Sequence, residues 1–261
     1  MADLDVANLS LRFGGLSVLE GVSFAVAPGE LLALIGPNGA GKTSVLNCIS
    51  GLYRPSAGSI RFEGQELVGR KPHEVARLGV ARTFQHGEMF PHLTALENLL
   101  IGRHTRMRTR IWGEALFSRR TRAEEVAHRL KVEEILDFVE LGRYRHARVG
   151  DLPFGIQKLI GFARALAPEP KLLLLDEPSA GLNRDEREDL ARFILRIKHE
   201  LGLPMVWIEH DMQMVADLAD RIVVLNYGRV LAEGVPEDVL KDARVVEAYL
   251  GPGTGAAAGP R

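Results

Sequence analysis

Four residues near the start of the chain have the types and the spacing that phosphate binding requires. Gly36, Gly41, Lys42 and Thr43 fit the pattern G-x-x-x-x-G-K-[ST]. Glycines let successive backbone N–H groups approach phosphate oxygens, because no Cβ stands in the way. Lys42 supplies a positive charge, and the Thr43 hydroxyl can bind Mg2+. This phosphate loop is predicted to bind a nucleotide through Gly36, Pro37, Asn38, Gly39, Ala40, Gly41, Lys42, Thr43 and Ser44.

Further polar residues follow two other apolar runs. Asp176 and Glu177 come directly after the run 171–175, and Glu209 and His210 come directly after the run 204–208. In an open parallel sheet, active residues lie at the carboxyl ends of the strands. We therefore expect these side chains to lie at the same edge of the sheet as the phosphate loop.

The elements that must position these residues can be located from the pattern of apolar residues. The opening of the chain is rich in predicted strands, at 4–13, 18–26 and 31–35, and shorter strands are predicted at 58–64 and 79–84. An amphipathic helix continues from the phosphate loop. Farther along, strands at 171–175, 204–208 and 221–225 alternate with helices at 185–200 and 211–219. Such alternation is typical of a parallel sheet covered on both faces.

The region from residue 93 to about 147 has a different character. The spacing of its apolar residues indicates helices with little strand between them, through Leu96, Leu99, Leu100, Val126, Leu130, Ile135, Leu136 and Val139. Between positions 103 and 122 there are seven arginines and only one acidic residue, Glu114. The arginines are Arg103, Arg106, Arg108, Arg110, Arg119, Arg120 and Arg122. We expect a solvated basic face, with contact to lipid head groups or to an acidic partner as the alternative.

Composition narrows the class of protein. The chain has 261 residues, 46% of them hydrophobic, and 33 basic residues balance 34 acidic ones. No global charge favours a nucleic-acid partner. The single cysteine, Cys48, lies on the apolar side of the predicted helix after the phosphate loop, so we expect a small buried residue. The chain has no run of roughly 18 apolar residues and no signal-peptide pattern, which predicts a cytosolic protein.

Taken together in this order, the motifs resemble those of the ATP-binding subunits of ABC transporters, from about residue 4 to residue 250. The resemblance depends on the phosphate loop, Gln85, the segment 152–157, Asp176 with Glu177, the segment 179–183 and His210. It implies an α/β fold with a RecA-like parallel-sheet core, an N-terminal antiparallel β subdomain and a helical subdomain. We expect one ATPase domain over 1–250, with the core in 1–87 and 161–250, the helical subdomain in 88–160, and a disordered tail at 251–261.

The resemblance also implies a role for each site residue. Asp176 orients Mg2+ through water, and Glu177 is the base that polarises the attacking water. His210 hydrogen-bonds to the γ-phosphate. Gln85 contacts Mg2+ and the water, and Phe13 stacks on adenine. ATP and Mg2+ are the implied substrate and cofactor. A guanine-specific Asn-Lys-x-Asp sequence is missing, which argues against a GTPase.

Two departures from the family pattern concern the contact between subunits. Where the family commonly has Leu-Ser-Gly-Gly-Gln, this chain has a signature segment consisting of Leu152, Pro153, Phe154, Gly155, Ile156 and Gln157. The resemblance implies that this segment caps the nucleotide of the opposite subunit, and Pro153 offers neither a hydroxyl nor an N–H. Asn183 stands where the family often has Asp. We therefore hypothesise that a heterodimer of two such ATPases has two unequal ATP sites.

Other stretches resemble the larger ATPase subunit of branched-chain amino acid uptake systems. They are residues 82–85, residues 208–212, the arginine-rich insertion and residues 245–251. This resemblance implies a second ATPase subunit, in a heterodimer or a homodimer, two membrane permease subunits, an extracytoplasmic solute-binding protein and a place on the cytoplasmic face of the inner membrane. Relatives that carry urea, amides or aromatic acids share these features. A soluble ABC ATPase and a non-hydrolysing regulatory module are the alternatives from other classes.

Overall fold

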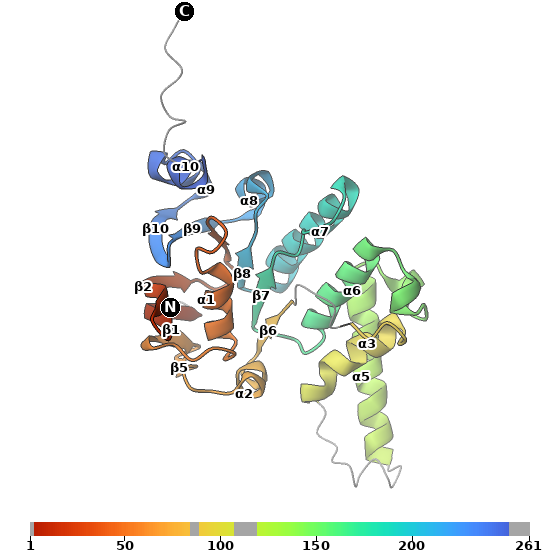
Figure 1. The fold of residues 1–261 in the computed structure, drawn as a ribbon. Helices are drawn as coiled ribbons and strands as arrows, with labels where there is room; N and C mark the ends of the chain where they lie inside the picture. Colours follow the sequence, from red (N-terminus) through yellow and green to blue (C-terminus); the bar gives the residue numbers. More distant parts are fainter. Residues whose placement is uncertain (1–2, 84–88, 107–118, 251–261) are drawn as a thin grey trace, which may run out of the picture.

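The computed structural model describes residues 3–83, 89–106 and 119–250, which form two sheets and a group of helices (Figure 1). Gln85, most of the arginine-rich insertion and the tail 251–261 lie outside the described residues. One sheet is antiparallel, in the order β2-β1-β4-β5. Its strands are β1 (Leu4–Phe13), β2 (Leu16–Val26), β4 (Ala57–Phe62) and β5 (Gln65–Glu66). The predicted antiparallel opening of the chain is confirmed.

The second sheet has the order β10-β9-β3-β8-β7-β6 and holds the strands that carry the site. From β9 to β6 every described neighbouring pair is parallel. β10, a strand that the apolar pattern did not predict, pairs antiparallel with β9 at one edge. The strands are β3 (Leu31–Ile35), β6 (Val80–Arg82), β7 (Leu172–Asp176), β8 (Met205–Ile208), β9 (Arg221–Asn226) and β10 (Arg229–Gly234).

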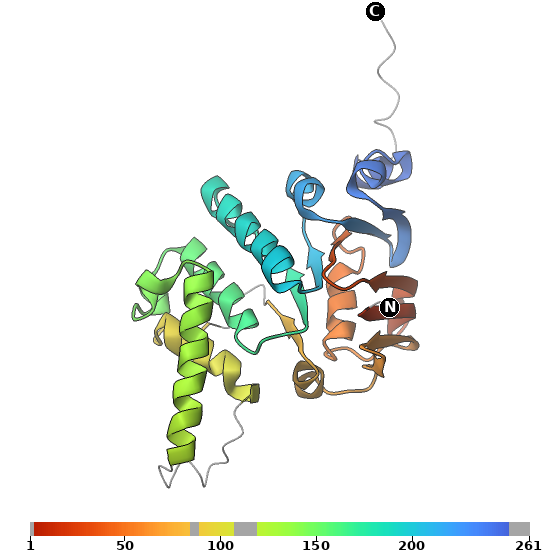
Figure 2. The ribbon, with the colours of Figure 1, turned by 180° about the vertical axis from the view of Figure 1, so that it is seen from behind.

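Residues alternate between the two faces of the parallel strands, and each face has its own core. Leu31 and Ala33 belong to a cluster with side chains of α6, α7 and α8, whereas Leu32 and Leu34 belong to a cluster with α1 and the antiparallel sheet. Figures 1 and 2 show these layers from opposite sides. The helices are α1 (Lys42–Ile49), α6 (Phe154–Leu166), α7 (Arg184–Arg196) and α8 (Met212–Leu218). Both faces of the central strands are therefore buried, as their uninterrupted apolar sequences require.

A separate group of helices lies beside β6, the edge strand (Figure 1). α3 (Ala95–Gly102) packs against α5 (Arg119–Phe138) and α6, which confirms the predicted helical region. Val126 and Leu130, which the spacing placed on its apolar face, are exposed. The remaining helices are α2 (Pro72–Arg77), α9 (Pro236–Val239) and α10 (Ala243–Leu250), with a π-helical turn at Ile197–Leu201 and 3-10 turns at Arg103–Arg106, Gly142–Tyr144 and Val149–Asp151. Across the described ranges no helix has the length and apolar character that would span a bilayer.

The prediction of a solvated basic face is wrong for Arg103, which is only 6% exposed. Its guanidinium donates to Ala167 O at 2.6 Å and to His128 Nδ1 at 3.0 Å, and it pairs with Glu169 at 3.1 Å. Arg106 donates to Pro168 O at 2.7 Å. An arginine guanidinium has five N–H donors and can bind several acceptors at once, so these two arginines hold the segment after α3 against the end of α6.

Cys48 is buried on α1, as predicted, with 2% of its surface exposed. Burial raises the pKa of its thiol to about 12, because a thiolate would lose its hydration there. The side chain therefore serves the packing beneath the phosphate loop and is not a nucleophile.

Candidate active site

The phosphate loop has a conformation that only glycine permits at two of its positions. Gly36 has φ 148°, and a Cβ there would lie 2.1 Å from Leu225 O. Gly41 has φ 103°, and a Cβ there would lie 2.6 Å from Leu19 Cδ2. Gly41 is also the N-cap of α1, so the positive end of that helix opens directly onto the loop. These glycines explain why the strand-to-helix turn can be so tight.

Lys42 is folded back over the phosphate loop. The side chain is buried, and its ammonium donates to Gly36 O at 2.6 Å and to Pro37 O at 3.0 Å. Burial lowers the pKa of Lys42, while the charges of Glu177 and Asp176 act in the opposite direction. The ammonium is therefore held inside the loop with both carboxylates within electrostatic reach.

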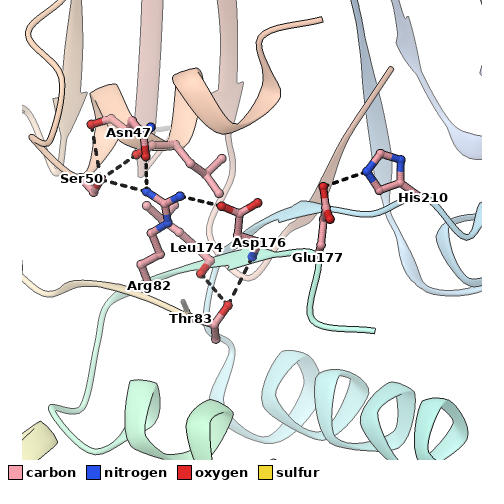
Figure 3. A network of polar contacts seen from close by, with 9 residues as sticks. Asn47, Ser50, Arg82, Thr83, Leu174, Asp176, Glu177 and His210 are labelled. Carbon is pink, nitrogen blue, oxygen red and sulfur yellow. Dashed lines mark hydrogen bonds and ion pairs between the residues drawn. The ribbon is translucent and has the colours of Figure 1, made fainter. Parts of the chain in front are cut away.

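Asp176 ends β7 and lies in a buried polar network that joins three elements (Figure 3). Its Oδ2 pairs with Arg82 Nη2 at 2.6 Å. The same guanidinium donates to Asn47 Oδ1 at 2.6 Å and to Ser50 Oγ at 3.4 Å, and Asp176 N donates to Thr83 Oγ1 at 3.2 Å. Burial raises the pKa of Asp176 despite the opposing effect of Arg82. The network fixes the end of β7 against β6 and α1.

Glu177 and His210 meet at the ends of adjacent strands. Glu177 Oε1 lies 2.8 Å from His210 Nε2, and both side chains are partly exposed (Figure 3). Glu177 has φ 47°, a conformation that costs a non-glycine residue about 1–3 kcal/mol. Its N–H donates to Ile208 O at 3.0 Å, which holds it beside β8. Glu177 can thus act as a base, because its contact with His210 fixes the orientation of its carboxylate.

A buried carboxylate lies directly before His210. Glu209 is 3% exposed, and its Oε1 accepts the N–H of His210 at 2.8 Å. Among the described residues its Oε2 has no hydrogen-bond partner. Glu209 therefore orients the backbone from which the His210 side chain projects.

The donor set fits Mg2+ held jointly by protein and nucleotide. Asp176 Oδ1 is buried and has no hydrogen-bond partner within the described part of the chain. Thr43 lies in the first turn of α1. The described residues contain no cluster of three or more His, Cys, Asp or Glu side chains that could hold a metal by themselves. Mg2+ keeps several waters and binds through one or two protein ligands plus phosphates, so such a sparse set suits it.

Phe13 lies at the end of β1 and is 50% exposed. Its ring meets that of Tyr53 edge to face, with centroids 5.2 Å apart. One face of a half-exposed ring supported at its edge can stack on a planar base. The adenine-stacking role of Phe13 stays a prediction.

The signature segment leads into α6. Pro153 is the N-cap of that helix, and Phe154 is 55% exposed. Gln157 Nε2 donates to Leu152 O at 2.8 Å, which closes the segment on itself. A Cβ on Gly155 would lie 2.1 Å from Glu186 Oε1, so the start of α6 is in close contact with α7.

Asn183 has a clear local role as the N-cap of α7. Asn183 Oδ1 accepts the N–H of Glu186 at 3.0 Å, and Glu186 Oε2 accepts the N–H of Asn183 at 2.9 Å. This reciprocal pair is a capping box, and Asn caps helices as well as Asp does. The departure from the family pattern therefore leaves the helix start intact.

The structure thus brings together the phosphate loop, Asp176, Glu177 and His210, at the ends of β3, β7 and β8. Two contributing residues were missed in the sequence: Arg82 and Lys158, whose ammonium donates to Ala180 O at 2.5 Å. Each is an isolated charged residue beside a motif. The one signal in the sequence that could have identified such a residue was the position of Arg82, close to the end of a predicted strand. Glu209 was expected at this edge of the sheet, and the structure adds its contact with the backbone of His210.

Known proteins share these features over most of the chain. Residues 19–180 match the family described as ABC transporter, and residues 229–251 match the family described as branched-chain amino acid ATP-binding cassette transporter. The chain is 40% identical over 248 residues to the high-affinity branched-chain amino acid transport ATP-binding protein BraF of Pseudomonas aeruginosa. The aligned part makes up 95% of this chain and 97% of BraF. It is 38% identical to LivG of Escherichia coli, a protein of the same description, with the same coverage.

Solved structures agree with these matches. An ATP-binding cassette of an ABC transporter in its ADP conformation aligns with a TM-score of 0.85 and 32% identity, over 96% of this chain and 99% of that one. A dimeric bacterial ABC transporter cassette aligns with a TM-score of 0.75 and 26% identity, over 89% and 98% of the two chains.

The raised pKa of Asp176 predicts a pH-dependent effect of removing its charge. Above its raised pKa, the folded chain carries a carboxylate that burial disfavours, whereas below the ordinary value of 3.8 the side chain is neutral in both the folded and the unfolded chain. Asp176→Asn is therefore expected to raise the midpoint of thermal unfolding of the nucleotide-free chain at pH 8. The gain should shrink as the pH falls toward 4.

Asp242→Asn is the matched control with the opposite sign. Hydrogen bonds from Arg244 hold the pKa of Asp242 below its ordinary value, so its charge stabilises the fold at pH 8. Thermal unfolding followed by circular dichroism at pH 4, 6 and 8 compares the two variants. A loss of stability at pH 8 in both would show that burial is not the dominant effect at Asp176.

Proposed function

The chain belongs to the ATP-binding proteins of the ABC transporter family, and we propose that it powers an importer of branched-chain amino acids by hydrolysing ATP. The observation that carries the proposal is the pairing of Glu177 with His210 at 2.8 Å, beside the loop that holds Lys42. A module that only bound nucleotide would have no need for this pair.

The proposed reaction uses residues at one edge of the sheet, where β3, β7 and β8 end. The phosphate loop and Lys42 bind the β- and γ-phosphates. Glu177 accepts a proton from the attacking water, whose oxygen forms a bond to the γ-phosphorus as the bond to the bridging oxygen of ADP breaks. Before ATP binds, His210 keeps the Glu177 carboxylate in one orientation, and with ATP bound it is proposed to hydrogen-bond to the γ-phosphate. Placing these groups before ATP arrives lowers the cost of organising the transition state.

Mg2+ is the cofactor that the site residues would accommodate. Thr43 Oγ1 and, through water, Asp176 would hold it, and Gln85 is a further proposed contact. When bound, it neutralises charge on the β- and γ-phosphates. Arg82 keeps the Asp176 carboxylate in place for this task.

A second ATPase subunit and two membrane subunits are the proposed partners. The signature segment and its exposed Phe154 are proposed to face the nucleotide of the second subunit, and a solved cassette of similar fold is described as dimeric. A cleft of about 1030 Å3 lies between the sheet and the helical group. It is lined by residues that include Leu52, Met89, Phe90, Ile101 and Phe162. We propose that a segment of a membrane subunit binds there, which places the chain on the cytoplasmic face of the membrane.

Branched-chain amino acids are the proposed cargo, because BraF and LivG are described as ATP-binding proteins of branched-chain amino acid transport and residues 229–251 match the corresponding family. We expect the chain to co-purify with two membrane subunits and a binding protein that retains leucine, isoleucine or valine. Isothermal titration of that binding protein with these amino acids, urea, short amides and aromatic acids decides between the candidate cargoes. Retention of urea or an amide alone would change the cargo and leave the ATPase role in place.

Glu177→Gln is expected to lower kcat for ATP hydrolysis by roughly 100-fold or more, the usual contribution of a general base. ATP affinity should stay within about threefold, because Glu177 does not belong to the phosphate loop. The measurement is steady-state hydrolysis and equilibrium ATP binding with the full chain and its co-purified subunits. Glu188→Gln, on the exposed face of α7, is the control and should leave both unchanged. Undiminished hydrolysis in Glu177→Gln would favour a different base or a different function.

The proposed inequality of the two ATP sites is tested by changing one subunit at a time. Pro153 at the N-cap of α6 removes a hydroxyl and an N–H from the surface that is proposed to cap the partner's nucleotide. Glu177→Gln in this chain should therefore remove most of the hydrolysis of a heterodimer, and the equivalent change in the partner should remove less. Equal losses from the two changes would end the idea.

A further inference from the structure

The start of α6 is fastened to the loop that carries Glu177, here called loop 177–183. Lys158 Nζ donates to Ala180 O at 2.5 Å and approaches Pro178 O at 3.4 Å. The same ammonium lies 5.5 Å from the centre of the Phe154 ring. That ring in turn covers Gly181, where a Cβ would lie 3.0 Å from Phe154 Cε1. One lysine and one aromatic ring from α6 therefore hold two consecutive turns of loop 177–183.

The charge of Lys158 is also placed near the reacting groups. Burial lowers the pKa of Lys158, and the carboxylates that oppose this shift are Glu209 and Glu177. Glu209 is itself buried, with one oxygen lacking a hydrogen-bond partner among the described residues. The ammonium thus lies within electrostatic reach of the carboxylate that is the proposed base and of the one that orients the backbone of His210.

Loop 177–183 needs an external restraint because its own backbone supplies little. It begins with Glu177 at φ 47°, and its internal hydrogen bonds are two turn bonds, from Ala180 N to Glu177 O and from Leu182 N to Ser179 O. Carbonyls that accept a bond from an ammonium are held more strongly than carbonyls bonded to a neutral donor. Removing Lys158 would leave the loop its apolar contacts, which are the Phe154 ring on Gly181 and the buried side chain of Leu182, but would remove the ammonium that binds its carbonyls.

We propose that Lys158 is a positioning residue, which fixes loop 177–183 against α6 and so holds Glu177 in its contact with His210. The inference rests on the proposed function, because it concerns the same ATPase site. It adds a physical link between the signature segment and this chain's own base. A displacement of α6 is thereby transmitted to Glu177 through the ammonium of Lys158, which acts beside the contact of Phe154 with Gly181.

Lys158→Met removes the donors and the charge while keeping a chain of similar length. We expect kcat for ATP hydrolysis to fall about 10- to 100-fold, the loss that a small misplacement of a reacting group produces, with KM for ATP within roughly threefold. Lys158→Arg keeps charge and donors and should recover a large part of kcat. Lys198→Met is the matched control, because Lys198 lies in the π-helical turn after α7 and donates to Leu218 O and Asp220 at the end of α8. It should leave kcat unchanged.

Hydrogen exchange supplies a readout that does not depend on activity. In the full chain, Lys158→Met should speed exchange of the amides of Ala180 and Leu182 and leave the phosphate loop unchanged, whereas Lys198→Met should affect neither. Lys158→Gln replaces Lys158→Met if the latter does not fold. Glu177→Gln is measured alongside: if it fails to lower kcat, the proposed function fails. A normal kcat in Lys158→Met beside an inactive Glu177→Gln, or a rise in KM alone, overturns the role of Lys158.

Discussion

Parallel pairing of β8 between β3 and β7 is the constraint on which the rest of the site depends. The register sets Leu34, Ile208 and Asp176 side by side, so Glu177 lies one residue beyond this line, and His210 and the start of the phosphate loop lie two residues beyond it. All three strands are buried on both faces, which prevents them from sliding relative to one another without exposing apolar side chains. The chemistry therefore depends on a register that the hydrophobic cores enforce.

This arrangement buries charged side chains, and their burial destabilises the free protein. Asp176 and Lys42 are both nearly buried, and burial acts against the charged form of each. Arg82 offsets part of this cost for Asp176, while Lys42 bonds to carbonyls of its own loop. A nucleotide carrying negative charge would relieve Lys42, and a cation would relieve Asp176. The same burial that weakens the free protein strengthens its electrostatic interaction with substrate.

Local sequence predicted the parts of the site that depend on local structure. A strand followed by a glycine-rich turn needs no distant partner, and an apolar run that ends in acids marks a strand end by itself. Arg82 and Lys158 could not be assigned, because each acts on a segment far along the chain, Asp176 for one and Ala180 for the other. Arg103 looked solvated for the same reason, since the carbonyl that it binds belongs to Ala167. The spacing of apolar residues also does not show where a long helix extends past its neighbours, and for this reason Val126 and Leu130 on α5 are exposed although they were predicted to lie on its apolar face.

The departures from the family pattern form a locally consistent set. Asn183 caps α7 through Glu186, and the Glu186 carboxylate lies where only a glycine fits, at Gly155. Phe154 covers Gly181. Pro153 begins α6 as its N-cap, a position at which the missing proline N–H breaks no hydrogen bond within the helix. The start of α6 and loop 177–183 are therefore packed as one unit, so a change at any of these positions alters the others. The motif alone suggests a weaker site for the partner's nucleotide, and the contacts add that Phe154 and Asn183 also hold the loop carrying Glu177.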